Sequence, residues 1–579
     1  MHDFKVWAPR VEKVSLQLQG DAPLSMQGPD DRGWWHLVIE KAGPGTDYAF
    51  ILNDNATAYP DPRSLSQPRG VHAASRVYDQ QAFRWTDAQW HTPSLSSAIL
   101  YELHVGTFSP QGTFDSAIDK LDYLVELGVT HIEVMPVNEF AGERGWGYDG
   151  VFLFAVFEPY GGPDALKRFV DACHAKNLAV VLDVVYNHFG PVGNYNNQFG
   201  PYLTDKYHSP WGAAVNFNEG GSDEVRRFFL DNALMWLRDF HCDGLRLDAT
   251  HELIDRSAMH FLEQLSAEVE RLGTTMNRKY VLIAESDLND PKFVRPREAR
   301  GYGMDAQWSD DFHHSLFTLL WNDPGRGYYD DFGSMDDLVK SLRGAFVYDG
   351  KYSKYRHHTH GRPVENLSAH HFMGYIQNHD QVGNRAAGER LEHLVGMDAA
   401  KVALGLTLTA PFVPMLWMGE EFAATAPFLY FADHEEEEMR RLVSEGRKRD
   451  FAAFGWGENE VPDPEALETF ERSKMDWDEV HVGKHEEMLA WVKALIRYRR
   501  TCMDLNDGDF NHLTVSCAHD GKSLIMQRGA VRVLMNLGEA IEIPRLNGES
   551  LKLASSDAIA VAGDQVRLPK MSLAVLQLG

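Results

Sequence analysis

Both ends of the chain show polar and apolar residues that alternate with a period of two. Examples lie at residues 14–18 and 48–50 near the start, and at residues 524–526, 531–533 and 541–543 near the end. Such alternation is typical of strands buried on one face only. The sequence therefore predicts an N-terminal β-sandwich over residues 1–92 and a second small all-β domain, also a sandwich, over residues 506–579.

Residues 93–505 follow a different pattern, in which helical stripes alternate with short, fully apolar runs. Residues 129–135 form one such run, and the helix before it is predicted from the stripe of Ile118, Leu121, Leu124 and Val125. Residues 413–420 would be the last strand of the series. Strands that alternate with helices indicate a parallel sheet. We therefore predict an α/β fold, a (β/α)8 TIM barrel flanked by the two β domains.

Three carboxylates stand at the ends of apolar runs: Asp248 after residues 244–247, Glu285 after residues 281–284, and Asp380 after the run that begins at Tyr375. Strands of a barrel deliver their last side chains to the face where active sites form, so we expect these acids to converge. Close carboxylates shift each other's pKa, which suits glycoside hydrolysis. The structural alternative is that each acid merely caps the helix after its strand.

Two neighbouring residues favour a catalytic role for these acids over a role as helix caps. Arg246 precedes Asp248 by two positions, so on a strand both side chains point to the same side, where a guanidinium can keep the carboxylate ionised. His188 ends the run 180–188 and adds a donor from another strand. The sequence therefore predicts a polar site at one end of the barrel.

Composition and charge exclude several classes of function. With 44% hydrophobic residues the chain is globular, and its net charge of −28 opposes binding to nucleic acids or anionic membranes but suits a neutral substrate. The four cysteines show neither metal-ligand spacing nor a disulfide framework. Residues 1–9 enter a strand pattern directly, without the charged and apolar parts of a secretory signal, so we expect a cytoplasmic protein.

Four motifs lie in the order and spacing of the conserved regions of a known family. They are residues 183–188 (Asp-Val-Val-Tyr-Asn-His), 244–249 (Gly-Leu-Arg-Leu-Asp-Ala), 284–286 (Ala-Glu-Ser) and 377–380 (Gln-Asn-His-Asp). In these segments the chain resembles the α-amylase superfamily, and the resemblance covers about residues 95–505. The N-terminal part is similar to the matching domain of isoamylases and branching enzymes. The resemblance implies a glycoside hydrolase or a glycan transferase.

The resemblance also implies roles for single residues. Asp248 would be the nucleophile, Glu285 the general acid and base, and Asp380 the acid that grips two sugar hydroxyls. Asp183 would support Arg246. The residues implied to bind the substrate are Tyr148, His188, Arg246, His251, His379, Gln381 and Arg385. In many α-amylases an asparagine at the place of Asn187 ligates calcium. The further acidic ligands are not recognisable here, so we expect no metal and no cofactor.

Six shorter segments narrow the resemblance to the trehalose-releasing members of the superfamily. They are residues 102–108, 285–291, 308–314, 431–434, 445–447 and 451–455. They imply a retaining hydrolase that cleaves the α-1,4 bond next to the terminal trehalose of maltooligosyl trehalose, and a pathway link to the synthase that builds that end. The alternatives are a glycogen branching enzyme, an isoamylase-type debranching enzyme, or a non-catalytic glycan-binding barrel, although such barrels tend to lose the acids.

Overall fold

The computed structural model describes residues 1–53, 55–321, 327–452 and 461–579. Its centre is a closed barrel of eight parallel strands, in which each strand pairs with the next along the chain and the last pairs with the first. In chain order the strands are β8 (Leu100–Leu103), β9 (His131–Val134), β12 (Ala179–Val184), β15 (Gly244–Leu247), β16 (Val281–Ala284), β17 (Ala306–Trp308), β20 (Phe372–Gly374) and β21 (Val413–Trp417). The predicted barrel is confirmed, including the last strand.

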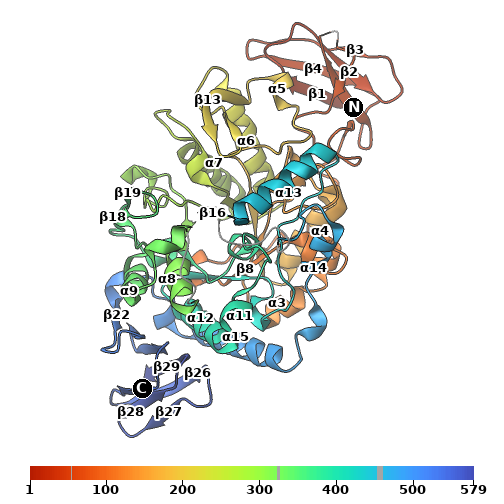
Figure 1. Ribbon diagram of the computed structural model, residues 1–579. Coiled ribbons are helices and arrows are strands. Elements are labelled where there is room, and N and C mark those ends of the chain that lie inside the picture. The colour runs from red at the N-terminus through yellow and green to blue at the C-terminus, as the bar shows by residue number, and fades with distance from the viewer. Residues whose placement is uncertain (54, 322–326, 453–460) are drawn as a thin grey trace.

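Antiparallel sheets flank the barrel, with the N-terminal sheets at one end of the molecule and the C-terminal sheets at the other (Figure 1). The N-terminal strands are β1 (His2–Trp7), β2 (Val14–Leu18), β3 (Leu24–Ser25), β4 (Trp34–Ile39), β5 (Asp47–Leu52), β6 (Ala58–Tyr59) and β7 (Ser75–Arg76). The C-terminal strands are β22 (Leu513–Cys517), β23 (Ser523–Arg528), β24 (Val531–Asn536), β25 (Ile541–Pro544), β26 (Glu549–Ala554), β27 (Ala560–Ala562), β28 (Gln565–Leu568) and β29 (Ser572–Leu578). This arrangement confirms the fold class.

Helices cover the outside of the barrel. The longer ones are α4 (Gly162–Ala175), α6 (Ser222–Arg238), α7 (Phe261–Met276), α8 (Asp310–Leu320), α9 (Met335–Gly344), α12 (Met397–Thr409) and α15 (Lys484–Thr501). The helix expected before β9 is divided into α2 (Phe114–Ile118) and α3 (Leu121–Leu127), and Gly128 ends α3 with φ +102°. Val125, one of the residues that predict this helix, does not face the core, because the residue is 42% exposed.

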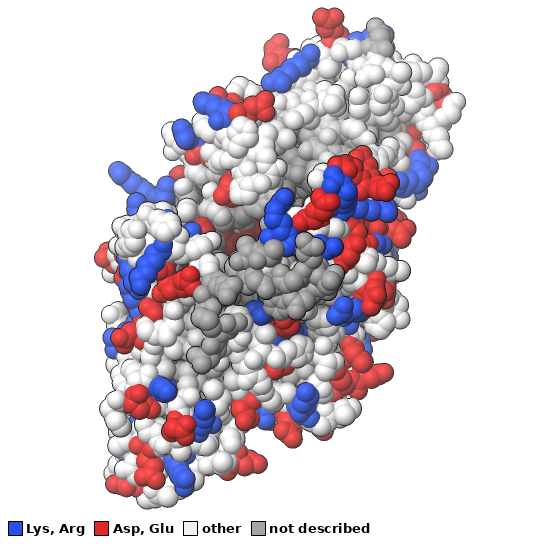
Figure 2. All heavy atoms as spheres, in the orientation of Figure 1, with Lys and Arg blue, Asp and Glu red and all other residues white. Residues whose placement is uncertain are grey.

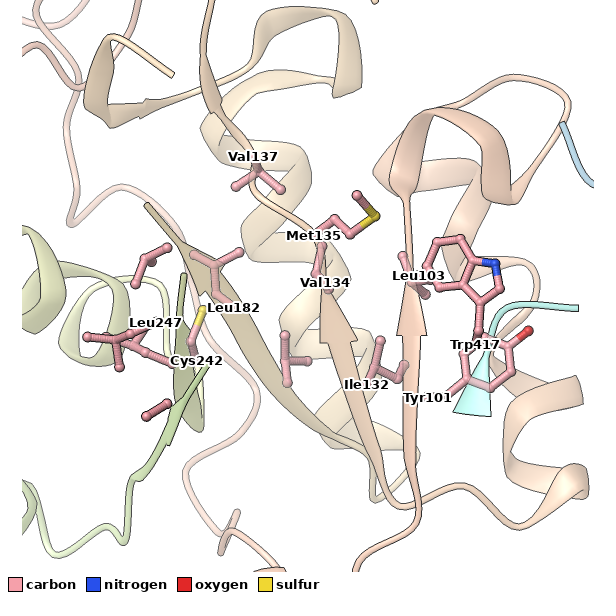
Figure 3. Packing of buried hydrophobic residues seen from close by; sticks show 14 of the residues in the cluster. Tyr101, Leu103, Ile132, Val134, Met135, Val137, Leu182, Cys242, Leu247 and Trp417 are labelled. Carbon is pink, nitrogen blue, oxygen red and sulfur yellow. The ribbon is translucent and has the colours of Figure 1, made fainter. Parts of the chain in front are cut away.

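Side chains of the barrel strands alternate between two environments. Those that point outward pack against the helices, as Figure 3 shows for Ile132 and Val134 of β9 beside Leu182 of β12. The inward-pointing residues include an apolar cluster with Val181, Ile283, Trp308 and Met415 among its members. In the same interior lie the charged residues of the site described below. The barrel is thus a packed core whose polar part lies toward one end.

One expectation about the third acid was wrong. The seventh strand, β20, ends at Gly374, so Asp380 does not stand at a strand end but in the first turn of the short helix α10 (His379–Gly383). The Asn378 side chain caps this helix by accepting a hydrogen bond from the Gln381 amide at 3.0 Å. An Asn cap satisfies a helix amide that would otherwise have no partner, which explains why a helix begins here.

The surface carries charges of both signs. On the face drawn in Figure 2, Lys and Arg are interspersed with Asp and Glu, including over helix α13 (Glu437–Ala452). None of the helices in the described part of the chain is long and apolar enough to cross a membrane. Within the segment 451–455, residues 453–455 lie outside the described residues.

Candidate active site

The first two predicted acids directly follow adjacent barrel strands. Asp248 comes after the last residue of β15 and Glu285 after the last residue of β16, and these strands pair in parallel. Arg246 of β15 binds both acids: NH1 donates to Asp248 Oδ1 at 3.1 Å and NH2 donates to Glu285 Oε2 at 2.7 Å. One guanidinium therefore holds the two carboxyl groups side by side at the carboxyl end of the barrel.

The same guanidinium connects to the third barrel strand. Arg246 NH1 donates to Asp183 Oδ2 of β12 at 2.6 Å, and the guanidinium lies over the Trp308 ring, 4.0 Å from its centroid. Arg246 is fully buried, so its charge is shielded little by water. The predicted support of Arg246 by Asp183 matches these contacts.

Burial controls the protonation of these acids. It raises the pKa of Glu285; the Arg246 cation opposes this rise, and the Asp248 carboxylate adds to it. Burial likewise raises the pKa of Asp183 to about 7, against the attraction of Arg246. Glu285 keeps 19% of its side chain exposed, so it is both accessible and inclined to carry a proton.

The third acid, Asp380, reaches the site from α10, and so does His379, which is predicted to bind the sugar. Tyr148, also predicted to bind the sugar, joins them from a loop. His379 Nε2 lies 3.5 Å from Asp380 Oδ1 and 2.8 Å from the Tyr148 hydroxyl. That hydroxyl also lies 2.7 Å from Asp183 Oδ2, and the rings of Tyr148 and His379 stack with centroids 5.2 Å apart. Asp380 is the most exposed of the three acids, at 40% of its side chain.

His188 joins the site through its neighbour. Its Nδ1 donates to Asn187 Oδ1, and Asn187 Nδ2 in turn donates to Asp248 Oδ2 at 2.7 Å. The His188 ring stacks on Trp211, an aromatic residue that we did not predict and whose residue surface is 51% exposed. Burial lowers the pKa of His188 to about 4, so the ring is neutral at pH 7. Asn187 therefore orients the predicted nucleophile.

The remaining predicted residues lie at the edge of the site. His251 Nε2 is 3.8 Å from Asp287 Oδ1, and Gln381 Nε2 donates to Asp310 Oδ1 at 3.2 Å. Arg385 stacks over Trp321, with its guanidinium carbon 4.8 Å from the ring centroid, and lies near Glu389. Neither of these two contacts of Arg385 involves one of the three acids.

Sequence reasoning missed two acids that face this site. Glu102 of β8 accepts hydrogen bonds from the backbone amide and from Nδ1 of His379. Asp310, the first residue of α8, accepts from the Tyr375 hydroxyl at 2.8 Å, and burial raises its pKa to about 7. A signal was present for Glu102, which is a charged residue inside the apolar run 99–103. Asp310 follows Gln307, Trp308 and Ser309, so no apolar run marks it.

Metal ligands and cavities give no competing site. Among residues 1–53, 55–321, 327–452 and 461–579, no group of three or more His, Cys, Asp and Glu side chains is arranged to hold a metal ion. A cavity of about 830 Å³ lies beyond the opposite end of the barrel strands, where Tyr280, Arg278 and Asp305 line it. Active sites of such barrels form at the carboxyl ends of the strands, which favours the carboxylates around Arg246.

Comparisons with known proteins show which proteins the chain is similar to. The family model of the α-amylase catalytic domain matches residues 62–208. A malto-oligosyltrehalose trehalohydrolase of Rhizobium sp. (strain M-11) is 46% identical over 99% of this chain and 97% of its own length, and one of Mycobacterium tuberculosis is 43% identical over 100% and 99%. A crystal structure of a candidate α-amylase from Salmonella typhimurium superposes with a TM-score of 0.91 at 36% identity, covering 99% of this chain and 97% of that one.

Proposed function

The chain belongs to the malto-oligosyltrehalose trehalohydrolase family and is a glycosidase of the α-amylase type, and we propose that the carboxylates around Arg246 are its active site. The substrate is a maltooligosyl trehalose, from which water releases trehalose by cleavage of the adjacent α-1,4 bond. The observation that carries this proposal is the single buried guanidinium that holds Asp248, Glu285 and Asp183 at the carboxyl end of the barrel.

Asp248 is the nucleophile in this proposal. Arg246 Nη1 and Asn187 Nδ2 each donate to one of its carboxylate oxygens, which fixes the direction of the carboxylate. An ionised carboxylate attacks the anomeric carbon and forms a covalent glycosyl-enzyme intermediate, which water then hydrolyses with overall retention.

Glu285 is the general acid and base. Its raised pKa lets it carry a proton to the leaving trehalose oxygen and then remove one from the attacking water. Arg246 NH2 and the Ala249 amide donate to Oε2, so the other oxygen, Oε1, is the one that carries the exchanged proton. The rate should fall as the pH rises through the pKa of Glu285, because the acid form disappears.

The sugar at the cleavage point is held by the remaining residues. Asp380 accepts hydrogen bonds from its hydroxyls, His188 and His379 contribute further contacts, and Tyr148 contacts its ring face. These contacts favour the distorted ring of an oxocarbenium-like transition state. His251, beside Asp287 and near Glu285, lies on the side of the leaving group.

The partners follow from this reaction. The substrate must come from an enzyme that converts the reducing end of a maltooligosaccharide into a trehalose unit, which is the pathway link to a malto-oligosyltrehalose synthase. A branching enzyme would use the same acids but would transfer the glycan to another glycan chain instead of to water. A debranching enzyme would use them to cleave a different glycosidic bond.

Product analysis tests the proposal. The protein is incubated with maltotriosyl trehalose and separately with maltopentaose, and the released sugars are separated by chromatography. We expect trehalose to be released from the first substrate about 10²-fold or more faster than the second substrate is cleaved. Polar groups of the protein that are placed for one sugar lose their hydrogen-bond partners with another. Comparable rates on both, or new α-1,6 branches in amylose, would contradict it.

A further inference from the structure

A carboxylate in the first barrel strand holds the residue next to Asp380. Glu102 of β8 is 1% exposed, and both of its oxygens bind His379: Oε2 accepts from the backbone amide at 3.0 Å, and Oε1 accepts from Nδ1–H. The first contact fixes the start of α10 and the second fixes the imidazole ring. No role in the reaction proposed above uses Glu102.

The other side of the imidazole completes a chain of hydrogen bonds. His379 Nε2 is 2.8 Å from the Tyr148 hydroxyl, which is 2.7 Å from Asp183 Oδ2. Asp183 Oδ2 already accepts from the Arg246 guanidinium at 2.6 Å and is therefore an acceptor. A tyrosine hydroxyl has one proton, so it donates to Asp183 Oδ2 and must accept from Nε2–H. Since Nδ1 also donates, the contacts are satisfied together when His379 is the imidazolium.

We propose that Glu102 is a positioning residue that holds His379 as an imidazolium and thereby orients both Tyr148 and Asp380 for the sugar. The part of this proposal that concerns the sugar rests on the proposed function. The part that concerns the charge of His379 does not, because it depends only on contacts within the protein.

The charges around His379 agree with the geometry. The groups that face it are Asp380 on α10, Glu102 on β8, Glu133 on β9, Asp183 on β12, Arg246 on β15, and Tyr148 and His104 from the adjoining loops. Burial alone would lower the pKa of His379, but the charges of Asp380 and Glu102 raise it to about 9.

Glu133 offers a matched control beside Glu102. The two glutamates are paired in register on adjacent strands and are equally buried. Burial and the charge of Glu102 raise the pKa of Glu133 well above its usual range, and neither of its oxygens has a hydrogen-bond partner among the residues that the structure describes. The raised pKa favours the protonated form of Glu133, which Glu133→Gln imitates, whereas Glu102→Gln removes one of the two oxygens that accept from His379.

Ring-¹⁵N NMR of histidine measures the charge directly. In the wild-type protein, with the His379 signals assigned from their loss in His379→Asn, we expect both ring nitrogens to carry protons up to about pH 8. In Glu102→Gln the pKa should fall to about 6.5 or below, and in Glu133→Gln it should stay near the wild-type value. A neutral His379 at pH 7 in the wild type would overturn the proposal even if Glu102→Gln did not fold, and so would an unchanged pKa in a folded Glu102→Gln.

Kinetics give the second reading. Glu102→Gln should lower kcat about 10²-fold with a smaller change in KM, because Asp380 and Tyr148 lose their alignment, and Glu133→Gln should keep kcat near the wild-type value. A Glu102→Gln protein with the lowered His379 pKa but unchanged kcat would contradict the orienting role. Absence of trehalose release by the wild type would overturn the proposed function and leave the NMR result untouched.

Discussion

One aspartate directly precedes strand β15 and another directly follows it, and the two differ in their hydrogen-bond donors and in their exposure to solvent. Asp243 precedes the strand and accepts four hydrogen bonds, from Trp90, Thr92, His174 and the Val180 amide. Burial alone would raise its pKa, but these donors, His174 above all, hold it below the usual range. Asp248 follows the strand, and its side chain is 11% exposed to solvent.

The surroundings differ in the same sense. At the start of the strands, His174 lies between Asp87 and Asp243 and stacks on Trp90, so that the segment leading into the barrel is fixed to its base. At the carboxyl end, burial raises the pKa of Glu285 and Asp183. An acid whose pKa is held low by donors of the fold stabilises the fold, whereas an acid whose burial raises its pKa and which stays accessible, as Glu285 does, is suited to exchange protons.

The largest effect should come from Asp248→Asn. Loss of the nucleophile should lower kcat on maltotriosyl trehalose on the order of 10⁴-fold or more, as is found when a covalent nucleophile is removed. The midpoint of thermal unfolding should change little. Asp243→Asn on the same strand is the control and should keep the kcat of the wild type at a temperature where it is folded. A similar loss of activity in both variants would contradict the assignment of catalysis to the carboxyl end of β15 and of fold stability to its start.

Glu285→Gln should have the next largest effect. Acid catalysis contributes about 10²- to 10⁴-fold, so turnover of the natural glycan should fall by that factor. A glucosyl substrate whose leaving group needs no proton should lose much less. Equal losses on both substrates would show that Glu285 is not the proton donor.

Asp243→Asn should destabilise the protein by about 3 kcal/mol, since it leaves a buried network without one of its charges. The pKa of Asp243 is lowered, so its contribution is present above about pH 4 and is lost as the pH falls through its folded pKa. His174 has a raised pKa, so its contribution is complete below about pH 6.5 and is lost as the pH rises through its folded pKa. The difference in unfolding midpoint between wild type and variant should be widest between these limits, and a difference that grew above pH 9 would contradict this assignment.

The smallest effect should come from Tyr148→Phe, which removes one hydroxyl and keeps the ring. We expect a loss of about 1 kcal/mol in transition-state stabilisation, measured as kcat/KM, because the hydroxyl orients Asp183 and His379 while the ring still contacts the sugar. Tyr148→Ala should cost more, about 1 to 3 kcal/mol by analogy with aromatic stacking on planar ligands. Unchanged kinetics in the alanine variant would make Tyr148 an ordinary loop residue.

The sequence predicts the end of a strand better than what lies beyond it. Asp248 and Glu285 lie where mostly apolar runs end, because a strand that is buried on both faces consists mainly of apolar residues. Asp380 was misplaced, since the run that begins at Tyr375 is not a strand: β20 ends at Gly374, and residues 375–378 form a buried loop before α10. The charge of Glu102 inside an apolar run was visible in the sequence, but its contact with His379 was not, because the two residues are 277 positions apart along the chain.

The most direct test of the central claim is to trap the covalent intermediate. The wild-type protein is treated with a fluorinated glucosyl donor that forms the glycosyl-enzyme but hydrolyses slowly, and the labelled peptide is sequenced by mass spectrometry. We expect the label on Asp248, at the carboxyl end of β15, and an α-anomer as the first product of the natural reaction. A label on Glu285 or Asp380, or a first product of inverted configuration, would contradict the assignment.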